Sequence, residues 1–280
     1  MDVPFIKLEG AGNDYVYIDL MKNGCDLPFD DLAKKISDRH FGVGSDGLVL
    51  IMKGSKAPFR MRMFNSDGSE AEMCGNAIRC VAKYLFDRGY SRKEELSVET
   101  LAGVKKLQIV ERDPEHGTTW VKVDMGAPIL RGADIPVNVD REPVLDIEVS
   151  GQRGTAVSMG NPHFVVFVDG ITDTQVLQHG PRIEKDPLFP SRTNVEFVKV
   201  IDRDNIEMRV WERGSGETLA CGTGACASVV AAVLGGHTSR NVSVKLRGGN
   251  LMIAWEKKNN RVYLTGPAQE VFSGVYFYEP

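Results

Sequence analysis

The sequence has 280 residues and a formal net charge of −4, so it lacks the basic excess that nucleic-acid-binding surfaces usually carry. A chain of this length forms one large core or two smaller ones, because single cores rarely grow past about 250 to 300 residues. Five cysteines without a Cys-x-x-Cys pair fit neither a disulfide framework nor a zinc site. We therefore expect a small-molecule substrate, no nucleic-acid partner and no metal.

The sequence gives no sign of a membrane or targeting segment. The amino terminus, Met1 to Pro4, has neither a basic region nor an apolar stretch, and no run approaches the roughly 18 apolar residues of a membrane span. We expect a cytoplasmic protein with no membrane partner, in which the cysteines are reduced.

Apolar alternation predicts strands in two successive halves of the chain. The first half has them at residues 5–9, 15–19, 48–52, 59–64, 103–110 and 119–125, and the second at residues 163–168, 195–200, 206–211, 242–246, 251–255, 261–264 and 271–277. Helices are predicted at residues 30–39, 75–88 and 222–234, with a short one near Thr174. The result is a strand-rich α+β fold. The segment 222–234 is apolar or small on every face and belongs inside a core.

Several residues recur in one register, which predicts a duplicated domain. Cys74 and Cys221 define an offset of 147 positions (221 − 74). Each copy reads as a strand, a glycine-rich loop, Cys-Gly and a helix. The other recurring pairs are Arg62 and Arg209, Phe64 and Trp211, Glu70 and Glu217, and, at an offset of 148, Asn13 and Asn161.

Cys74 and Cys221 each stand immediately before a predicted helix, where unpaired N–H groups and the positive end of the macrodipole favour an anion. We expect this to lower the thiol pKa, since a change from about 8.5 to about 7 requires roughly 2 kcal/mol. Two equivalent thiols facing one carbon would remove a proton from one face and return a proton to the other, as a racemase requires. The other cysteines, Cys25, Cys80 and Cys226, are expected only to pack.

Two further groups of polar residues stand at predicted strand ends. His163, after Asn161, and the pair Glu212-Arg213 could orient a substrate or tune a cysteine, or could simply close turns. Glycine patterns that resemble dinucleotide fingerprints do not fit their context. The one at Gly42 precedes a strand instead of following one, and the one at Gly222 lacks an acidic residue about 20 residues further on. We therefore expect no nicotinamide cofactor.

Seven segments, in order and along nearly the whole chain, resemble the diaminopimelate epimerase family. They are Gly10 to Asp14, Arg39 to Asp46, Phe64 to Ser69, Met73 to Asn76, Gly160 to His163, Asn194 to Phe197, and Trp211 to Gly214 followed by Glu217 to Gly224. The resemblance implies two pseudo-symmetric barrel-like lobes of mostly antiparallel strands, each around a central helix. Residues 1–118 and 266–280 would form the lobe carrying Cys74, residues 119–265 the lobe carrying Cys221, and the active site would occupy the cleft between them.

The resemblance also implies an activity: interconversion of LL- and meso-2,6-diaminoheptanedioate, for lysine and peptidoglycan biosynthesis, without pyridoxal phosphate or any other cofactor. Cys74 and Cys221 would carry the proton transfers, supported by His163 and Glu212. Amides both donate and accept hydrogen bonds and so suit a doubly zwitterionic ligand. The residues that would bind substrate are Asn13, Asn65, Gly75, Asn76, Asn161, Asn194, Glu212, Arg213, Gly222 and Thr223. A homodimer is allowed, though not indicated, by the sequence.

One departure from the family and two alternative functions stay open. Many members of the family carry Gln where this chain has Gly47, which leaves one substrate contact in doubt. An epimerase of the same fold for proline-like or other amino acids is the nearest alternative, although proline racemases tend to have His at the position of Asn76. Arg213 also suits a second carboxylate. The other alternative, a non-catalytic amino-acid-binding protein, would not need both cysteines.

Overall fold

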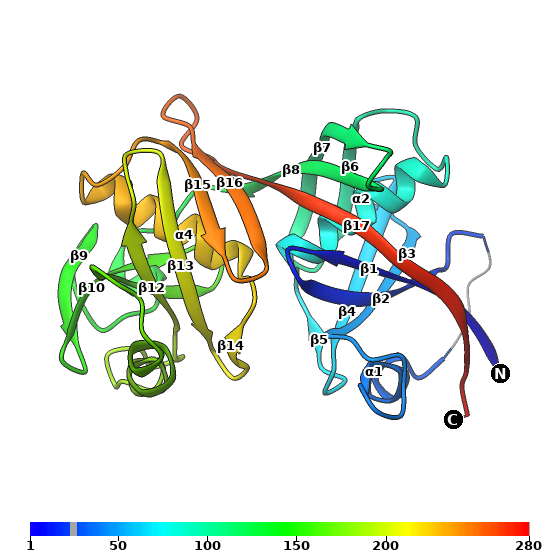
Figure 1. Cartoon of the computed structure of the whole chain (residues 1–280), viewed down its shortest axis with the longest axis horizontal. Helices are drawn as coiled ribbons and strands as arrows, with labels where there is room; N and C mark the ends of the chain where they lie inside the picture. Colours follow the sequence, from blue (N-terminus) through cyan, green and yellow to red (C-terminus); the bar gives the residue numbers. More distant parts are fainter. Residues whose placement is uncertain (23–26, 280) are drawn as a thin grey trace. The chain divides into compact units, whose positions relative to one another are not determined.

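The computed structural model describes residues 1–22 and 27–279, and the chain divides into two compact units (Figure 1). Unit 1 comprises Met1–Val123 and Gly266–Pro280, and unit 2 comprises Asp124–Thr265. The first boundary lies inside strand β8 (Thr118–Gly126), whereas the sequence-based boundary lies at its first residue. Cys25, which we expect only to pack, lies outside the described residues. Within them, no helix has the length and apolar character needed to cross a bilayer.

Unit 1 is a closed ring of strands around a central helix, α2 (Gly75–Asp87), whose residues from Gly75 to Leu85 are all buried. Around the ring, each strand pairs with the next: β1 (Asp2–Gly10), β2 (Asn13–Asp19), β3 (Gly47–Lys53), β4 (Phe59–Asn65), β6 (Glu95–Thr100), β7 (Gly103–Asp113), β8, β17 (Val262–Phe277) and again β1. The pairs β2–β3 and β4–β6 are parallel. Helix α1 (Phe29–Ser37) packs on the outside through Leu32, Ala33 and Ile36.

Unit 2 is built in the same way around α4 (Gly222–Leu234), which has no charged residue and buries ten positions. Its strands are β9 (Val144–Val149), β10 (Gln152–Ser158), β11 (Pro162–Phe167), β12 (Asn194–Val200), β13 (Asn205–Glu212), β15 (Asn241–Leu246), β16 (Gly249–Trp255) and the start of β17. The pairs β11–β12 and β13–β15 are parallel. The short helical elements are η1 (Gly132–Asp134), η2 (Gln175–His179) and α3 (Gly180–Glu184), of which η2 and α3 connect β11 to β12 as α1 connects β2 to β3.

The two units repeat one connectivity, as the recurring residues predict. Helices α2 and α4 begin at Gly75 and Gly222, and each follows a short strand, β5 (Glu70–Ala71) or β14 (Gly216–Thr218), which pairs with β4 or β13. Even the ion pair recurs: Arg62 Nε lies 2.7 Å from Glu70 Oε1, and Arg209 Nε lies 2.8 Å from Glu217 Oε1. The predicted fold of two pseudo-symmetric, barrel-like lobes is therefore confirmed.

Several elements differ from the sequence-based expectation. Strand β17 is continuous over sixteen residues, whereas two separate strands were expected at 261–264 and 271–277. Its partner changes along its length, because Thr265 pairs with β16 and Gln269 with β1. The sequence also failed to predict β5, β6, β9, β10 and β14.

Candidate functional site

The Cys74 cluster, defined as Asn13, Asp46, Cys74 and Asn76, lies in unit 1 at the start of α2. Cys74 is the N-cap of this helix, with the extended backbone (φ −130°, ψ 125°) that lets the helix begin at Gly75. Its thiol donates to Asn13 Oδ1 at 3.4 Å, and Asn76 Nδ2 donates to the same oxygen at 3.3 Å. Asn13 thus connects the β1–β2 turn to the helix start.

Charged residues hold Asn13 in this orientation. Its Nδ2 donates to Asp46 Oδ2 at 2.6 Å, and Arg39 bridges Asp46 and Asp14 at 2.9 Å to each. Burial raises the pKa of Asp46, as does the charge of Asp14. Burial acts on Asp14 too, but hydrogen bonds from Arg39 and Lys7 outweigh it and lower the pKa of Asp14. The amide of Asn13 is therefore anchored, with its oxygen turned towards Cys74.

The other predicted residues of unit 1 lie on the adjoining elements. Asn76 is buried, and its Oδ1 has no hydrogen-bond partner among the described residues. The Gly75 carbonyl accepts from Arg79 Nη1 at 3.0 Å. Asn65 ends β4, and its Nδ2 donates to Ser69 Oγ at 3.0 Å. This hydrogen bond joins Asn65 to the turn between β4 and β5.

The Cys221 cluster, defined as Asn161, His163, Glu196, Glu212, Cys221 and Thr223, lies in unit 2 at the start of α4. Cys221 is the N-cap of this helix and is 6% exposed. Its Sγ accepts from the backbone N–H of Gly224 at 3.4 Å and lies 3.5 Å from Thr223 Oγ1. The N–H contact is the one expected for a side chain that caps a helix.

The pKa of Cys221 does not follow the expectation from its helix start. Burial raises it well above the ordinary value, and the carboxylates of Glu212 and Glu196 raise it further. The hydrogen bonds from Thr223 and Gly224 oppose this rise but do not reverse it. The prediction of a lowered thiol pKa is therefore wrong for Cys221, because desolvation and two nearby acids outweigh the helix terminus.

Glu212 ends β13 and interacts with Cys221. Thr218 Oγ1 donates to Glu212 Oε1 in a short hydrogen bond. Burial raises the pKa of this carboxyl, whereas the hydrogen bond from Thr218, the charge of His163 and a hydrogen bond with Cys221 lower it. A carboxyl with a raised pKa that contacts a thiol can exchange a proton with it.

A chain of polar contacts leads from Glu196 to Cys221. His163 Nδ1 lies 2.7 Å from Glu196 Oε1, and its Nε2 lies 3.0 Å from Asn161 Oδ1. Asn161 Nδ2 donates to Thr223 Oγ1 at 3.3 Å, beside the sulfur. Sequence reasoning did not single out Glu196, because a glutamate between two apolar strand residues reads as solvent-facing. Its only signal was its place inside Asn194 to Phe197, a segment quoted for the family resemblance.

Asn194 and Arg213 lie at the entry of β12 and the exit of β13. Asn194 is 4% exposed, and its Nδ2 donates to the Pro162 carbonyl at 2.9 Å. Its Oδ1 accepts from the backbone N–H of Arg213 at 2.9 Å. The guanidinium of Arg213 donates to the Ser191 carbonyl at 2.9 Å and remains partly exposed. Asn194 thus orders the loop that presents Arg213.

Gly47, where many members of the family carry Gln, has no space for a side chain. It begins β3, and a Cβ there would lie 2.1 Å from the carbonyl oxygen of Phe64 and 2.9 Å from the ring of Tyr15. In this chain the backbone of β4 therefore leaves no room for a side chain at residue 47 unless β4 moves.

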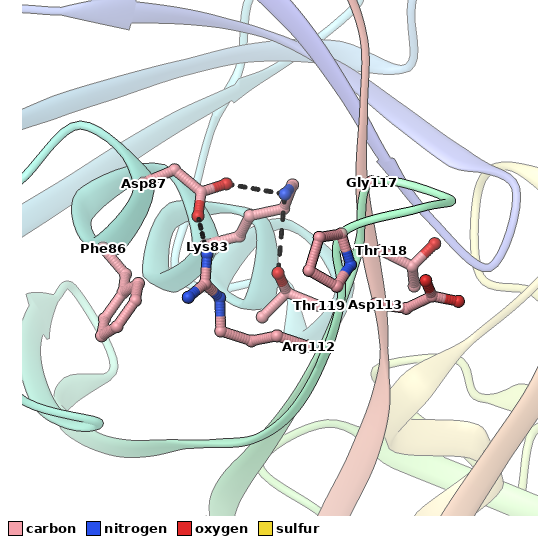
Figure 2. Close-up of a pocket in the computed structure, with 9 residues that line it drawn as sticks. Lys83, Phe86, Asp87, Arg112, Asp113, Gly117, Thr118 and Thr119 are labelled. Carbon is pink, nitrogen blue, oxygen red and sulfur yellow. Dashed lines mark hydrogen bonds and ion pairs between the residues drawn. The ribbon is translucent and has the colours of Figure 1, made fainter.

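A polar cavity of about 380 Å³ lies towards the other end of α2 (Figure 2). Lys83 Nζ contacts Asp87 at 2.7 Å and Thr119 at 3.5 Å, and Arg112 lies 3.6 Å from Asp87. Figure 2 shows these charged groups pointing towards one another. They satisfy one another and include no predicted site residue.

Comparison with known proteins places the chain in a family. The model of the family described as diaminopimelate epimerase matches residues 5–130 and 155–271. A protein named diaminopimelate epimerase from Acetivibrio thermocellus is 56% identical over 96% of this chain and 97% of its own length. One of the same name from Desulfovibrio desulfuricans is 54% identical over 98% of each chain.

Solved structures with little sequence similarity share the fold. A phenazine biosynthesis protein of the PhzF family from Bacillus anthracis has a TM-score of 0.68 at 18% identity, covering 99% of this chain and 100% of that one. A hydroxyproline epimerase from Agrobacterium vitis has a TM-score of 0.65 at 14% identity, covering 98% and 90%. At these identities the likeness shows the fold alone. The family match and the two highly identical relatives establish that this chain belongs to the diaminopimelate epimerase family.

Proposed function

We propose that the chain interconverts LL- and meso-2,6-diaminoheptanedioate by a two-thiol mechanism. One cysteine, as thiolate, takes the proton from the α-carbon and becomes a thiol. The other, a thiol on the opposite face, gives its proton to the carbanion and becomes a thiolate. Proton number is conserved, and the stereocentre is inverted without moving the substrate. The observation that carries this proposal is that Cys74 and Cys221 are the N-caps of equivalent central helices in two units of the same connectivity.

The helix starts supply the second requirement, which is stabilisation of the carbanion. The backbone N–H groups that follow each cysteine begin at Gly75 and Gly222, so no side chain obstructs a substrate carboxylate that approaches them. A carboxylate hydrogen-bonded there would better delocalise the negative charge that develops on the α-carbon. Thr223 and Asn76 follow these glycines and would bind the same group.

The remaining polar residues are assigned by their contacts. His163 and Glu212 adjust the protonation of Cys221, because Glu212 hydrogen-bonds the thiol and His163 interacts with Glu212. Asn13 and Asn161 contact Cys74 and Thr223 respectively and would bind the reacting ammonium and carboxylate groups. Asn65, Asn194 and Arg213 would bind the distal end, where the guanidinium pairs with the second carboxylate. A proline-like substrate would give Arg213 no partner.

Solvent deuterium incorporation tests the proposal. In D₂O the wild-type protein should introduce deuterium at the α-carbon of either stereoisomer, observed by proton NMR, and approach one LL-to-meso ratio from both sides. Cys74→Ala and Cys221→Ala should each abolish inversion. Matched controls are Cys80→Ala and Cys226→Ala, which remove buried thiols inside the helices and should leave exchange intact. Absence of α-proton exchange in the wild-type protein with diaminoheptanedioate would contradict the proposed function.

Two finer expectations, a cytoplasmic location and a homodimer, stay predictions. Cell fractionation and light scattering coupled to size exclusion would check them. Neither is needed for the chemistry described above, because every residue assigned a role comes from one chain.

A further inference from the structure

Arg79, on α2 one turn after its first residue, is a fully buried arginine. It is 0% exposed, and no carboxylate lies within ion-pair distance of it among the residues that the structure describes. Its Nε donates to the Pro267 carbonyl at 3.2 Å and its Nη1 to the Gly75 carbonyl at 3.0 Å, while Nη2 has no described partner. An unpaired buried charge is costly and is seldom retained without a role.

The guanidinium points towards the start of the helix. Because helical side chains lean towards the N-terminus, Arg79 reaches back one turn to Gly75, the residue after Cys74. A Cβ built on Gly10 would lie 3.0 Å from Arg79 Nη2 and 3.4 Å from the Asn76 carbonyl oxygen, so the same glycine borders both residues. The cation therefore lies beneath the first turn of α2, beside the backbone that carries Cys74.

The second unit has no such cation. At the offset of 147, the position of Arg79 is taken by Cys226, which is fully buried in α4. Conversely, the two carboxylates near Cys221 have uncharged counterparts in unit 1: Glu212 corresponds to Asn65 and Glu196 to Val49. The two copies thus keep the cysteine and its helix but place charges of opposite sign beside them.

We propose that Arg79 is a positioning residue that stabilises the Cys74 thiolate, so that Cys74 ionises at a lower pH than Cys221 and acts first as the base. This inference rests on the two-thiol function proposed above. It gives the free protein a preferred proton distribution, with the proton on Cys221. Turnover from this state leaves a thiol at Cys74 and a thiolate at Cys221, and the reverse reaction or exchange with solvent restores the starting form.

The groups around Arg79 are consistent with this assignment. Burial lowers the pKa of Arg79, and the neighbouring acids Cys80, Cys74, Tyr17 and Glu9 raise it. Arginine nevertheless stays protonated in proteins. Cys80 cannot take the role of anion, since burial raises its pKa to about 12. Burial likewise raises the pKa of Tyr17 well above its ordinary value.

Two further groups lie near this pair. The Glu9 carboxylate, on β1, accepts from the Gly12 backbone N–H at 2.8 Å, and its charge acts on Arg79 and Cys80. Asn13 Oδ1 accepts from the Cys74 thiol and therefore favours the protonated form. Arg79 is the positive group that works against this hydrogen bond.

The pH dependence of alkylation tests the proposal. The folded wild-type chain is treated with iodoacetamide from pH 5 to 10 without substrate, and modification of each cysteine is quantified by mass spectrometry, with fragment ions separating Cys74 from Cys80. The midpoint of each profile is compared, since midpoints report ionisation while maximal rates also report access. Cys74 should show the lower midpoint. Arg79→Gln should raise the Cys74 midpoint by about one to two pH units, which makes alkylation at neutral pH about 10- to 100-fold slower, and should leave Cys221 unchanged.

Two control variants separate charge from structure. Arg79→Lys keeps the charge and should retain the low Cys74 midpoint, whereas Arg112→Gln removes an exposed positive charge near the other end of α2 and should change neither profile. An equal or higher midpoint for Cys74 than for Cys221 in the wild-type protein overturns the proposal, even if Arg79→Gln does not fold. An unchanged Cys74 midpoint in folded Arg79→Gln overturns it as well. Because no substrate is present, neither result bears on deuterium exchange, which tests the function itself.

Discussion

His163 Nδ1 lies 2.7 Å from Glu196 Oε1, and neither side chain is exposed to solvent. A buried carboxylate that contacts one ring nitrogen fixes the orientation of an imidazole ring. In the Cys221 cluster, Glu196 thereby holds the His163 ring, whose Nε2 contacts Asn161. Asn161 in turn donates to Thr223, which lies beside the Cys221 sulfur.

Replacing Glu196 with Gln should lower kcat by about 10- to 100-fold, because a charge-assisted hydrogen bond contributes about 1.5 to 3 kcal/mol. KM should change little, since Glu196 has no surface from which to contact substrate. The measurement is kcat and KM at one pH near neutrality. Glu99→Gln is the matched control: this carboxylate accepts from the backbone of Ser55 and Lys56 in unit 1. An equal fall in kcat for Glu99→Gln would indicate a general loss of stability instead.

Replacing Glu212 with Gln should lower activity and raise stability at neutral pH. Burial raises the pKa of this carboxyl in the folded state, so ionisation disfavours folding as the pH rises from the unfolded pKa towards the folded one. Gln cannot ionise, and its advantage in urea unfolding should therefore grow as the pH rises above the unfolded pKa of about 4.3. If the variant is less stable than wild type at pH 7, the carboxylate is better solvated than its contacts indicate.

Replacing Gly224 with Ala should damage the Cys221 cluster from within the helix. The added Cβ would lie 2.6 Å from Glu196 Oε1, an atom fixed by His163. Overpacking typically costs about 1 to 3 kcal/mol, more than the roughly 0.5 to 1 kcal/mol that Ala gains over Gly in a helix. The midpoint temperature of thermal unfolding and kcat should both decrease. Gly170→Ala, where a Cβ meets nothing within 4 Å, should change neither quantity.

Replacing Asp14 with Asn should cost about 2 kcal/mol of unfolding free energy at pH 7. Lys7 and Arg39 hold the pKa of Asp14 below its ordinary value, so its contribution is present above the unfolded pKa and lost as the pH falls through the folded pKa. In urea titrations, wild type and variant should therefore converge as the pH falls below the ordinary Asp pKa of about 3.9. A difference that persists unchanged in strong acid would mean that shape, and not charge, matters at this position.

Most of the fold could be predicted, because the apolar alternation of a strand and the capping residues of a helix are local properties of the sequence. The bounds of α4 follow from the Cys-Gly start and the Gly235 that follows Leu234. Strand β10 was missed because Gly154 and Thr155 give it no apolar alternation, although both are buried. Strand β6 begins with an exposed glutamate and then buries Glu99, which conceals its period.

The site was predicted unevenly for a related reason. Cys74 and Cys221 can be recognised in the sequence alone, because each stands at a helix start, recurs in the internal repeat and lies in a motif. The charged residues Glu196 and Arg79 cannot be recognised in this way. What sets them apart is that they are buried, and burial depends on strands and helices distant in sequence. The lowered pKa expected for Cys221 was wrong on the same account.

The shared connectivity of the two units has a consequence for recognition. In diaminoheptanedioate only one stereocentre reacts, and the distal one keeps its configuration, so the LL and meso forms are not mirror images of each other. A protein with two identical copies would carry the same side chains beside both cysteines and could not tell the two ends of such a ligand apart. The copies differ, because at the offset of 147 Arg213 corresponds to Ser66 and Cys226 to Arg79. Duplication thus accounts for the two equivalent cysteines, and divergence between the copies accounts for the different charges that accompany them.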